Sequence, residues 1–264
     1  MDQFIQDIVR EAGEAIRPLF LNTGVKYTKN GEHDVVTEAD LLSNEILTSR
    51  IHGAYQDHGI ISEEIPEEHW QTDREYTWII DPLDGTKMFA TGWPLFGVMV
   101  ALQHEKEIEL GAIYFPVTDE LLFAKRGGGA WLNGERLQAS SRERLDSSFG
   151  TASSWSGKWV SPKEQRRRLM AYMEAMLSRN MTGMSIWAIC VSVKSVAEGK
   201  QDWMFTGGQW WDFAPAKVIL EEAGCLVTNG DGKPLVLGEA RGLIAANPSL
   251  HPQLCDVLGL SCGE

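Results

Sequence analysis

The segment WIIDPLDGTKMF, residues 78–89, constrains the fold of this chain more than any other stretch. An apolar strand, residues 78–80, runs directly into two aspartates, Asp81 and Asp84, with a proline between them. Strands usually leave a protein core through polar turns, so one aspartate would need no explanation. Two aspartates followed by Gly85, where backbone can approach a ligand closely, predict a site at the end of a buried strand.

Other acidic residues stand at the ends of predicted elements in the same way. Asp40 lies in the first turn of a predicted helix, Glu63 and Glu64 follow an apolar strand, and Asp212 stands at the predicted N-cap of a later helix. Because strand ends gather at one edge of a sheet, carboxylates placed there are expected to converge. The simpler alternative is that each one only caps a helix or a turn.

Converging carboxylates without His or Cys partners are typical of sites for hard cations, Mg²⁺ above all. The chain has 37 Asp and Glu against 24 Lys and Arg, a formal charge of −13, which disfavours attraction to nucleic acid or anionic membranes. Several divalent ions held over the carboxylates would present a positive face to phosphate oxygens. Gly85 and Thr86, at the start of a predicted helix, are then placed to receive the phosphate.

The order of predicted elements indicates an α+β fold in which helices pack on sheets. Helices are expected over residues 1–20, after Thr37, over 165–177 and 186–198, after Asp212 and from about residue 249. Short strands are expected at residues 35–36, 60–61, 78–80, 96–102, 109–114, 121–124, 225–227 and 243–245, with a hairpin turn at Asn133-Gly134. A polar segment, ASSRERLDSS, suggests two halves: residues 1–145, with most of the acids, and residues 146–264, with Asp212. No apolar run is long enough to span a bilayer and the start is unlike a signal peptide, so a cytoplasmic protein is expected.

These motifs resemble those of the inositol monophosphatase family of metal-dependent, lithium-sensitive phosphatases over nearly the full chain. WIIDPLDGTKMF is similar to the family's first signature and WWDFAPAKVILEEAG to its second, with DVVTEAD and ISEE upstream in the expected order. The resemblance implies a layered α-β-α-β-α sandwich of the sugar-phosphatase type. It also implies an enzyme that hydrolyses phosphoric monoesters with two or three Mg²⁺ ions, usually as a homodimer.

The resemblance also assigns roles to residues. Thr86, paired with Asp40, and Glu63 would position and deprotonate the attacking water. Gly85 and Thr86 would contact the phosphate. The predicted metal ligands are Glu63, Asp81, the backbone carbonyl of Leu83, Asp84 and Asp212.

Further assignments concern the pocket for the leaving group and one basic side chain. Gly183 and Ser185 fall where the family lines the pocket for the leaving group, although they read equally well as the entry to a helix. Asp212 would also border the substrate, and Lys29 matches a basic position near the metals.

The substrate is the open question. Animal-type members carry a glutamate shortly before the Trp-Asp of the second signature, where this chain reads MFTGGQWWD. Lys87 with the following PLFG is more similar to histidinol-phosphate phosphatases and related bacterial members, and nucleotide phosphatases of the superfamily also favour Lys at this position. The leading prediction is a Mg²⁺-dependent phosphatase of a small polyol phosphate such as inositol monophosphate. Histidinol phosphate, phosphoadenosine-type nucleotides and fructose bisphosphate are the alternatives, with a non-catalytic metal- or phosphate-binding regulator as the reading outside enzymes.

Overall fold

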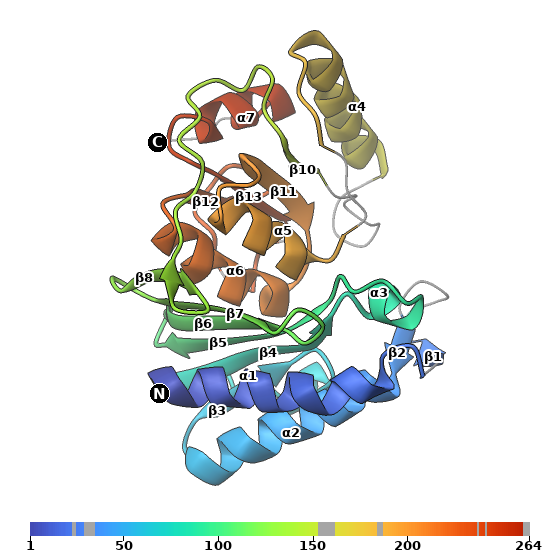
Figure 1. Ribbon diagram of the computed structural model, residues 1–264. Helices are drawn as coiled ribbons and strands as arrows, with labels where there is room; N and C mark the ends of the chain where they lie inside the picture. Colours follow the sequence, from blue (N-terminus) through green and yellow to red (C-terminus); the bar gives the residue numbers. More distant parts are fainter. Residues whose placement is uncertain are drawn as a thin grey trace.

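The computed structural model describes residues 1–22, 25–28, 35–152, 162–183, 187–236, 238–240 and 242–260. Two helices, a seven-stranded sheet, two more helices, a four-stranded sheet and two outer helices lie in successive layers (Figure 1). The predicted α+β, layered α-β-α-β-α sandwich is confirmed. Among the described residues, no helix is long and apolar enough to cross a membrane.

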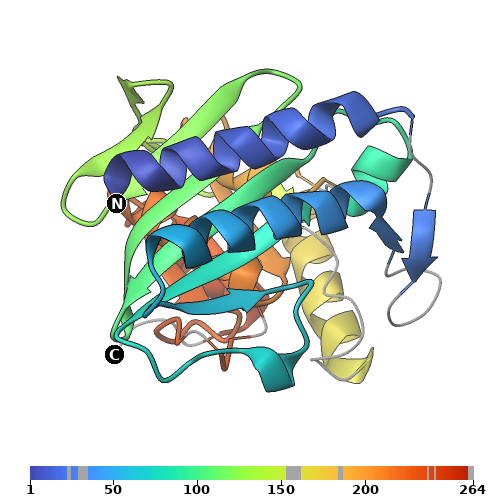
Figure 2. The ribbon, with the colours of Figure 1, turned by 90° about the horizontal axis from the view of Figure 1, so that it is seen from below.

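The first layer consists of α1 (Asp2–Ile16) and α2 (Glu38–Ala54), which run side by side across one face of the large sheet (Figure 2). Apolar residues recur along α1 at helical spacing and bury completely against the sheet. At the start of α2, the Thr37 hydroxyl accepts the N–H of Ala39 at 3.2 Å. Both helices are therefore where the sequence predicts them. A short ribbon of β1 (Val25–Thr28) and β2 (Val35–Thr37) precedes α2.

The large sheet has the order β3-β4-β5-β6-β7-β8-β9, with β3 and β4 parallel and the other neighbours antiparallel. Asn133 and Gly134, at the tip of the predicted hairpin, both have positive φ angles, 49° and 83°. Two positive φ angles are what a tight two-residue turn requires. The strands are β3 (Gly59–Ser62), β4 (Tyr76–Asp84), β5 (Gly97–His104), β6 (Glu107–Phe115), β7 (Glu120–Lys125), β8 (Gly129–Leu132) and β9 (Glu135–Arg136).

Helices α5 (Ile189–Ala197) and α6 (Trp210–Glu222) fill the space between the two sheets (Figure 1). One apolar core joins them to the large sheet, so that Met99 and Ile113 belong to the same cluster as Val218 and Ile219. The polar segment between β9 and β10 contains the predicted boundary at residue 145. Because this core takes side chains from both sides of that boundary, the division into two halves stays a prediction.

The second sheet has the order β10-β11-β13-β12, and α4 (Pro162–Ser178) and α7 (His251–Leu258) cover its outer face (Figure 1). Its strands are β10 (Gly150–Ala152), β11 (Trp203–Gly207), β12 (Leu226–Asn229) and β13 (Gly242–Ala246). The sequence predicts β12 and β13 but not β10 or β11.

Candidate active site

A bulge in β4 turns Asp81 and Asp84 to the same side of the large sheet. In a regular strand, residues three apart point to opposite faces. Here Asp81 pairs with Met99 and Asp84 with Gly97, so three steps along β4 match two along β5. Pro82, which has no N–H for the ladder, lies within this irregularity, as prolines in sheets usually do. Both carboxylates therefore face the layer of α5 and α6.

The carboxylates of Asp81, Asp84 and Asp212 come together there, with one oxygen of each within 4.8 Å of the others. All three residues are buried, with 2 to 8% of their surface exposed. Glu63 follows β3 directly and continues its parallel pairing, because its N–H donates to the carbonyl of Ile80 at 3.2 Å. The structure thus brings three predicted metal ligands into one cluster and places Glu63 beside them.

This cluster carries more negative charge than a buried site tolerates alone. Burial, followed by the charges of Glu63, Asp84 and Asp212, raises the pKa of Asp81 well above its ordinary value of 3.8. Burial and the charge of Asp84 likewise raise the pKa of Asp212 well above 3.8. A cation among these oxygens would remove the repulsion, and hard divalent cations prefer such donors. The residues present therefore fit a divalent metal ion.

The N-terminal ends of two helices offset part of the negative charge of the buried carboxylates. The Oδ2 atom of Asp84 accepts the N–H of Cys190, in the first turn of α5, at 2.5 Å. The Oδ2 atom of Asp212 accepts the N–H of Gln209 at 2.5 Å. Partial positive charge at a helix N-terminus stabilises such carboxylates. The predicted N-cap of α6, Asp212, is wrong by three positions: Gln209 is the cap, and Asp212 completes a capping box with it.

Thr86 and Asp40 form the predicted pair. The Thr86 hydroxyl donates to Oδ1 of Asp40 at 2.9 Å and lies 3.1 Å from the carbonyl oxygen of Leu83. Oδ2 of Asp40 accepts both the N–H and the hydroxyl of Thr37, at 2.7 and 2.6 Å. Burial raises the pKa of Asp40, and these hydrogen bonds oppose the rise. The arrangement fixes the direction in which the Thr86 hydroxyl points.

Gly85 joins β4 to the short helix α3 (Thr86–Ala90) in a conformation that other residues rarely adopt. Its φ angle is 91°, and a Cβ atom would lie 2.8 Å from both the Cβ of Ala188 and the carbonyl oxygen of Leu95. Glycine is therefore required here by space as well as by backbone angle.

A hydrogen bond from α2 supports this turn and was not predicted from the sequence. The buried Ser43 hydroxyl on α2 donates to the carbonyl of Pro82 at 2.7 Å. A serine on a helix gives no sequence signal for that contact.

The backbone conformation and the surroundings of residue 183 also require a glycine. Its φ angle is 150°, and a Cβ atom would lie 1.9 Å from the carbonyl oxygen of Gly150 in β10. Its carbonyl accepts a hydrogen bond from the hydroxyl of Tyr172. The predicted role of Gly183 at the leaving-group pocket stays a prediction, and Ser185 and Lys29 lie outside the described residues.

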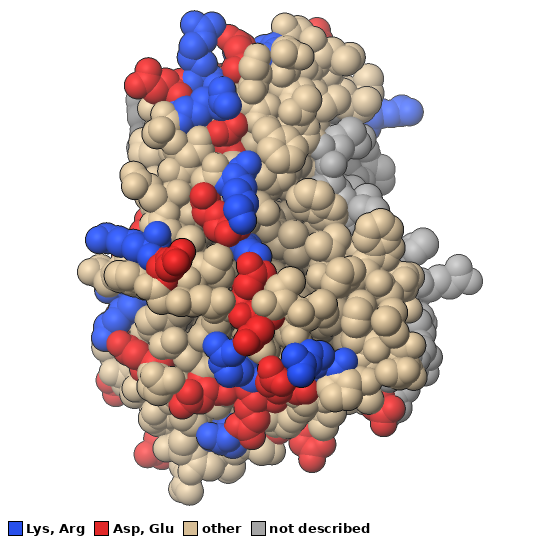
Figure 3. Space-filling view, in the orientation of Figure 1, with Lys and Arg blue, Asp and Glu red and all other residues tan. Residues whose placement is uncertain are grey.

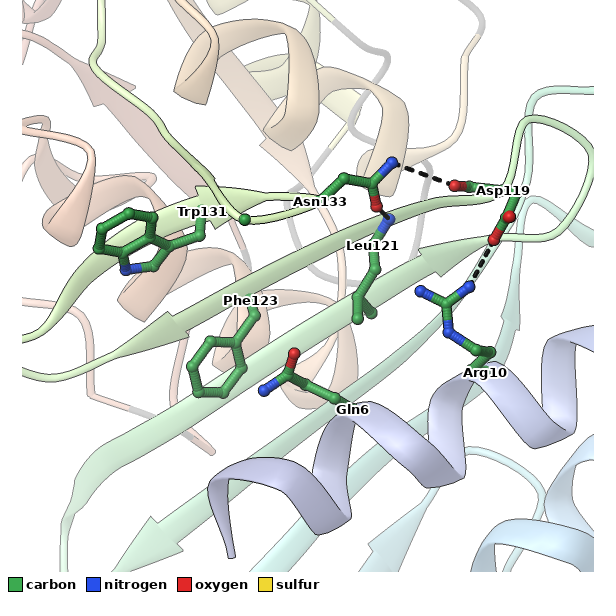
Figure 4. A pocket seen from close by; sticks show the side chains of 8 residues that line it. Gln6, Arg10, Asp119, Leu121, Phe123, Trp131 and Asn133 are labelled. Carbon is green, nitrogen blue, oxygen red and sulfur yellow. Dashed lines mark hydrogen bonds and ion pairs between the residues drawn. The ribbon is translucent and has the colours of Figure 1, made fainter.

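A separate cavity of about 520 Å³ lies between α1 and strands β7 and β8 (Figure 4). Arg10 pairs with Asp119 at its edge, and the ring of Phe123 and the indole of Trp131 line it. The side-chain amide of Asn133 accepts a hydrogen bond from the N–H of Leu121 and donates one to the carbonyl of Asp119. None of the predicted site residues that the structure describes lines this cavity.

Comparison with known proteins decides among the families that use such a site. The model of the inositol monophosphatase family matches residues 1–259. The chain belongs to the inositol monophosphatase family. It is a phosphatase, a hydrolase of phosphoric monoesters.

Relatives of this family member span its whole length. An inositol monophosphatase of Dictyostelium discoideum is 31% identical to it over 98% of this chain and 96% of the relative. A protein named putative Nus factor SuhB, from Neisseria meningitidis serogroup B, is 30% identical over 98% of both chains. The solved inositol monophosphatase (IMPase) structure of Thermotoga maritima superimposes with a TM-score of 0.84 at 27% identity, covering 98% of this chain and 97% of that one.

Proposed function

We propose that this inositol monophosphatase family member is a Mg²⁺-dependent phosphomonoesterase acting on a small polyol phosphate such as inositol monophosphate. The observation that carries the proposal is the approach of three buried carboxylates to within 4.8 Å of one another. Bound Mg²⁺ would lower the pKa of the attacking water and stabilise the charge on the phosphate oxygens. The residues proposed to hold two or three ions are Glu63, Asp81, Leu83 through its carbonyl, Asp84 and Asp212.

The chain's own groups would orient the reaction. Because the Thr86 hydroxyl donates its proton to Asp40, its oxygen is left to accept a hydrogen bond from the water. Glu63, half-buried beside the cluster, would take part in removing the proton from that water. The backbone N–H groups of Gly85 and Thr86 would bind the phosphate group that the water attacks. Gly183, Ser185 and Asp212 would border the leaving group.

Bound cations also reconcile an anionic substrate with a chain of formal charge −13. On the described part of the face in Figure 3, Lys and Arg side chains are interspersed with Asp and Glu and form no continuous basic patch. Small phosphorylated metabolites are therefore the proposed partners, with no role for nucleic acid or membrane. A cytoplasmic homodimer is proposed by analogy with the family.

The segment that precedes Asp212 bears on the substrate. Phe205, at the centre of β11, is 4% exposed, and Gly207 and Gly208 follow it without a carboxylate that could bind ring hydroxyls. Because this segment lacks such a carboxylate, histidinol phosphate and phosphoadenosine-type nucleotides stay alternative substrates to inositol monophosphate. A non-catalytic regulator is disfavoured because all the proposed ligands and Thr86 are present.

A substrate panel tests the proposal. The purified protein is incubated with Mg²⁺ and inositol monophosphate, histidinol phosphate, a phosphoadenosine nucleotide or fructose bisphosphate, and released phosphate is measured. We expect the fastest release from inositol monophosphate and inhibition by lithium. Folded protein that releases phosphate from none of them would contradict the proposal, and preference for another member of the panel would correct the substrate.

A further inference from the structure

The segment that carries Glu63 leaves the large sheet and returns to it. The chain departs after β3, and the N–H of Gln71 comes back to the carbonyl of Ile60 at 3.4 Å. Inside this loop, residues 63–70, the indole N–H of Trp70 donates to the carbonyl of Ile65 at 2.8 Å. Trp70 therefore closes the loop on itself.

The ring of Trp70 also reaches across to α6. Its centroid lies 5.8 Å from that of Trp210 and 6.0 Å from that of Trp211, at interplanar angles of 47° and 78°. Tilted and edge-to-face rings at these distances attract one another. We call these three side chains the tryptophan clamp. Trp210 and Trp211 are the two residues immediately before Asp212. The clamp therefore joins the Glu63 loop to the first turn of α6, which contains Asp212.

The α6 side of the clamp is fixed from a second direction. A Cβ atom on Gly238 would lie 2.1 Å from Cζ2 of Trp210, so the backbone of this glycine rests directly on the indole. Trp70, Trp210 and Trp211 are all half-buried at the border of the core between the sheets. Trp70 thus meets a surface that is itself held in place.

We propose that Trp70 is a positioning residue for metal binding. It holds the loop of Glu63 against the end of α6 that carries Asp212, and so keeps Glu63 beside the three clustered aspartates. The proposal rests on the metal role of Glu63 and Asp212 proposed above. Carboxylates brought together without a cation repel, so a loop that carries one of them needs an anchor to stay in place. Trp210 and Trp211 also pack against the core between the sheets. The clamp gives that packing a function.

Replacing the anchor tests this directly. In Trp70→Ala we expect the Kd for Mg²⁺, measured by calorimetry without substrate, to rise about ten-fold, as for other residues that orient metal ligands. The Mg²⁺ concentration for half-maximal phosphate release should rise equally. Trp70→Phe keeps an aromatic ring and should recover most of the affinity. If Trp70→Ala does not fold, Trp70→Leu, which keeps apolar volume but no ring, replaces it.

Trp131→Ala is the matched control. Trp131 on β8 is also half-buried, and its indole N–H also donates to a backbone carbonyl, that of Gly128, at 3.1 Å. It lies at the separate cavity rather than beside the acids. We expect its Kd for Mg²⁺ to stay at the wild-type value. An equal rise in Trp131→Ala would show a general effect on stability and overturn the proposal.

A double-mutant cycle separates this inference from the proposed function. If Trp70 acts through Glu63, then adding Trp70→Ala to Glu63→Gln should change the Kd for Mg²⁺ no further. Effects that multiply would refute a role through Glu63. If Glu63→Gln alone leaves Mg²⁺ binding unchanged, the proposed role of Glu63 fails. If Glu63→Gln weakens binding but Trp70→Ala does not, only the positioning role fails.

Discussion

Asp84 makes two kinds of contact at once. One carboxylate oxygen accepts the N–H of Cys190 at 2.5 Å, and the carboxylate belongs to the cluster with Asp81 and Asp212. In Asp84→Asn the amide oxygen can still accept that hydrogen bond, while the charge is lost. We expect the fold to persist and phosphate release to fall by at least about 100-fold. Asp119→Asn, at a side chain 64% exposed, is the matched control and should keep full activity. Unchanged turnover in Asp84→Asn would rule out its proposed role.

Thr86 offers a test of water activation that is separate from metal binding. Its hydroxyl is held by Asp40 at 2.9 Å, and its side chain is not among the proposed ligands. Thr86→Val keeps the shape but removes the hydroxyl, so kcat should fall by about 100-fold with little change in Mg²⁺ affinity. Thr86→Ser should retain most of the activity. Full activity in Thr86→Val would mean that shape, rather than the hydroxyl, matters at this position.

Among the elements, the sequence predicts those whose signals are local. Apolar residues at helical spacing and the Thr37 cap are enough to locate α1 and α2. Strands β10 and β11 are missed because β10 has only three residues and because both pair with strands far away in the chain, which no local pattern records. The bulge in β4 is missed for a related reason: only the register against β5 reveals it. The sequence thus predicts that Asp81, Asp84 and Asp212 converge, but not the irregularity that turns two of them to one side.

Helix α7 is held in place partly by a buried side chain that titrates, His251. His251, in its first turn, is 3% exposed, and its Nε2 atom lies 3.0 Å from the Thr228 hydroxyl on β12. Burial lowers the pKa of His251 below its ordinary value of 6.5. The unfolded chain therefore takes up a proton at higher pH than the folded chain does. The stability that comes from neutral His251 is fully present above pH 6.5 and is lost as the pH falls towards the lowered pKa.

His251→Gln should remove this part of the pH dependence. We expect the free energy of unfolding, measured by denaturant titration at pH 7.5 and 5.5, to fall less between these pH values in the variant than in the wild type. Other titrating groups are common to both proteins and cancel in the comparison. Identical pH dependence would show that His251 is not the titrating anchor.

At the scale of the whole molecule, the acid cluster lies where two layers meet. Asp81 and Asp84 come from the large sheet and Asp212 from α6, so like charges oppose the contact between these layers. Because their pKa values are raised in the folded protein, the metal-free protein should lose stability as the pH rises from about 4, the range where unfolded carboxyl groups ionise. A cation held by these carboxylates would reverse this loss of stability.

Mg²⁺ should therefore raise the melting temperature. At a free concentration of 100 times the Kd, a ligand that binds only the folded state adds about 2.7 kcal/mol, which corresponds to a shift of roughly 5–10 °C for a domain of this size. The shift, measured by scanning fluorimetry with Mg²⁺ against chelator, should be larger at pH 8 than at pH 5, because protons compete for the carboxylates. Asp84→Asn should show little shift, yet melt no lower than the wild type in chelator, since it removes a buried charge. Equal shifts in both proteins would place the cation elsewhere.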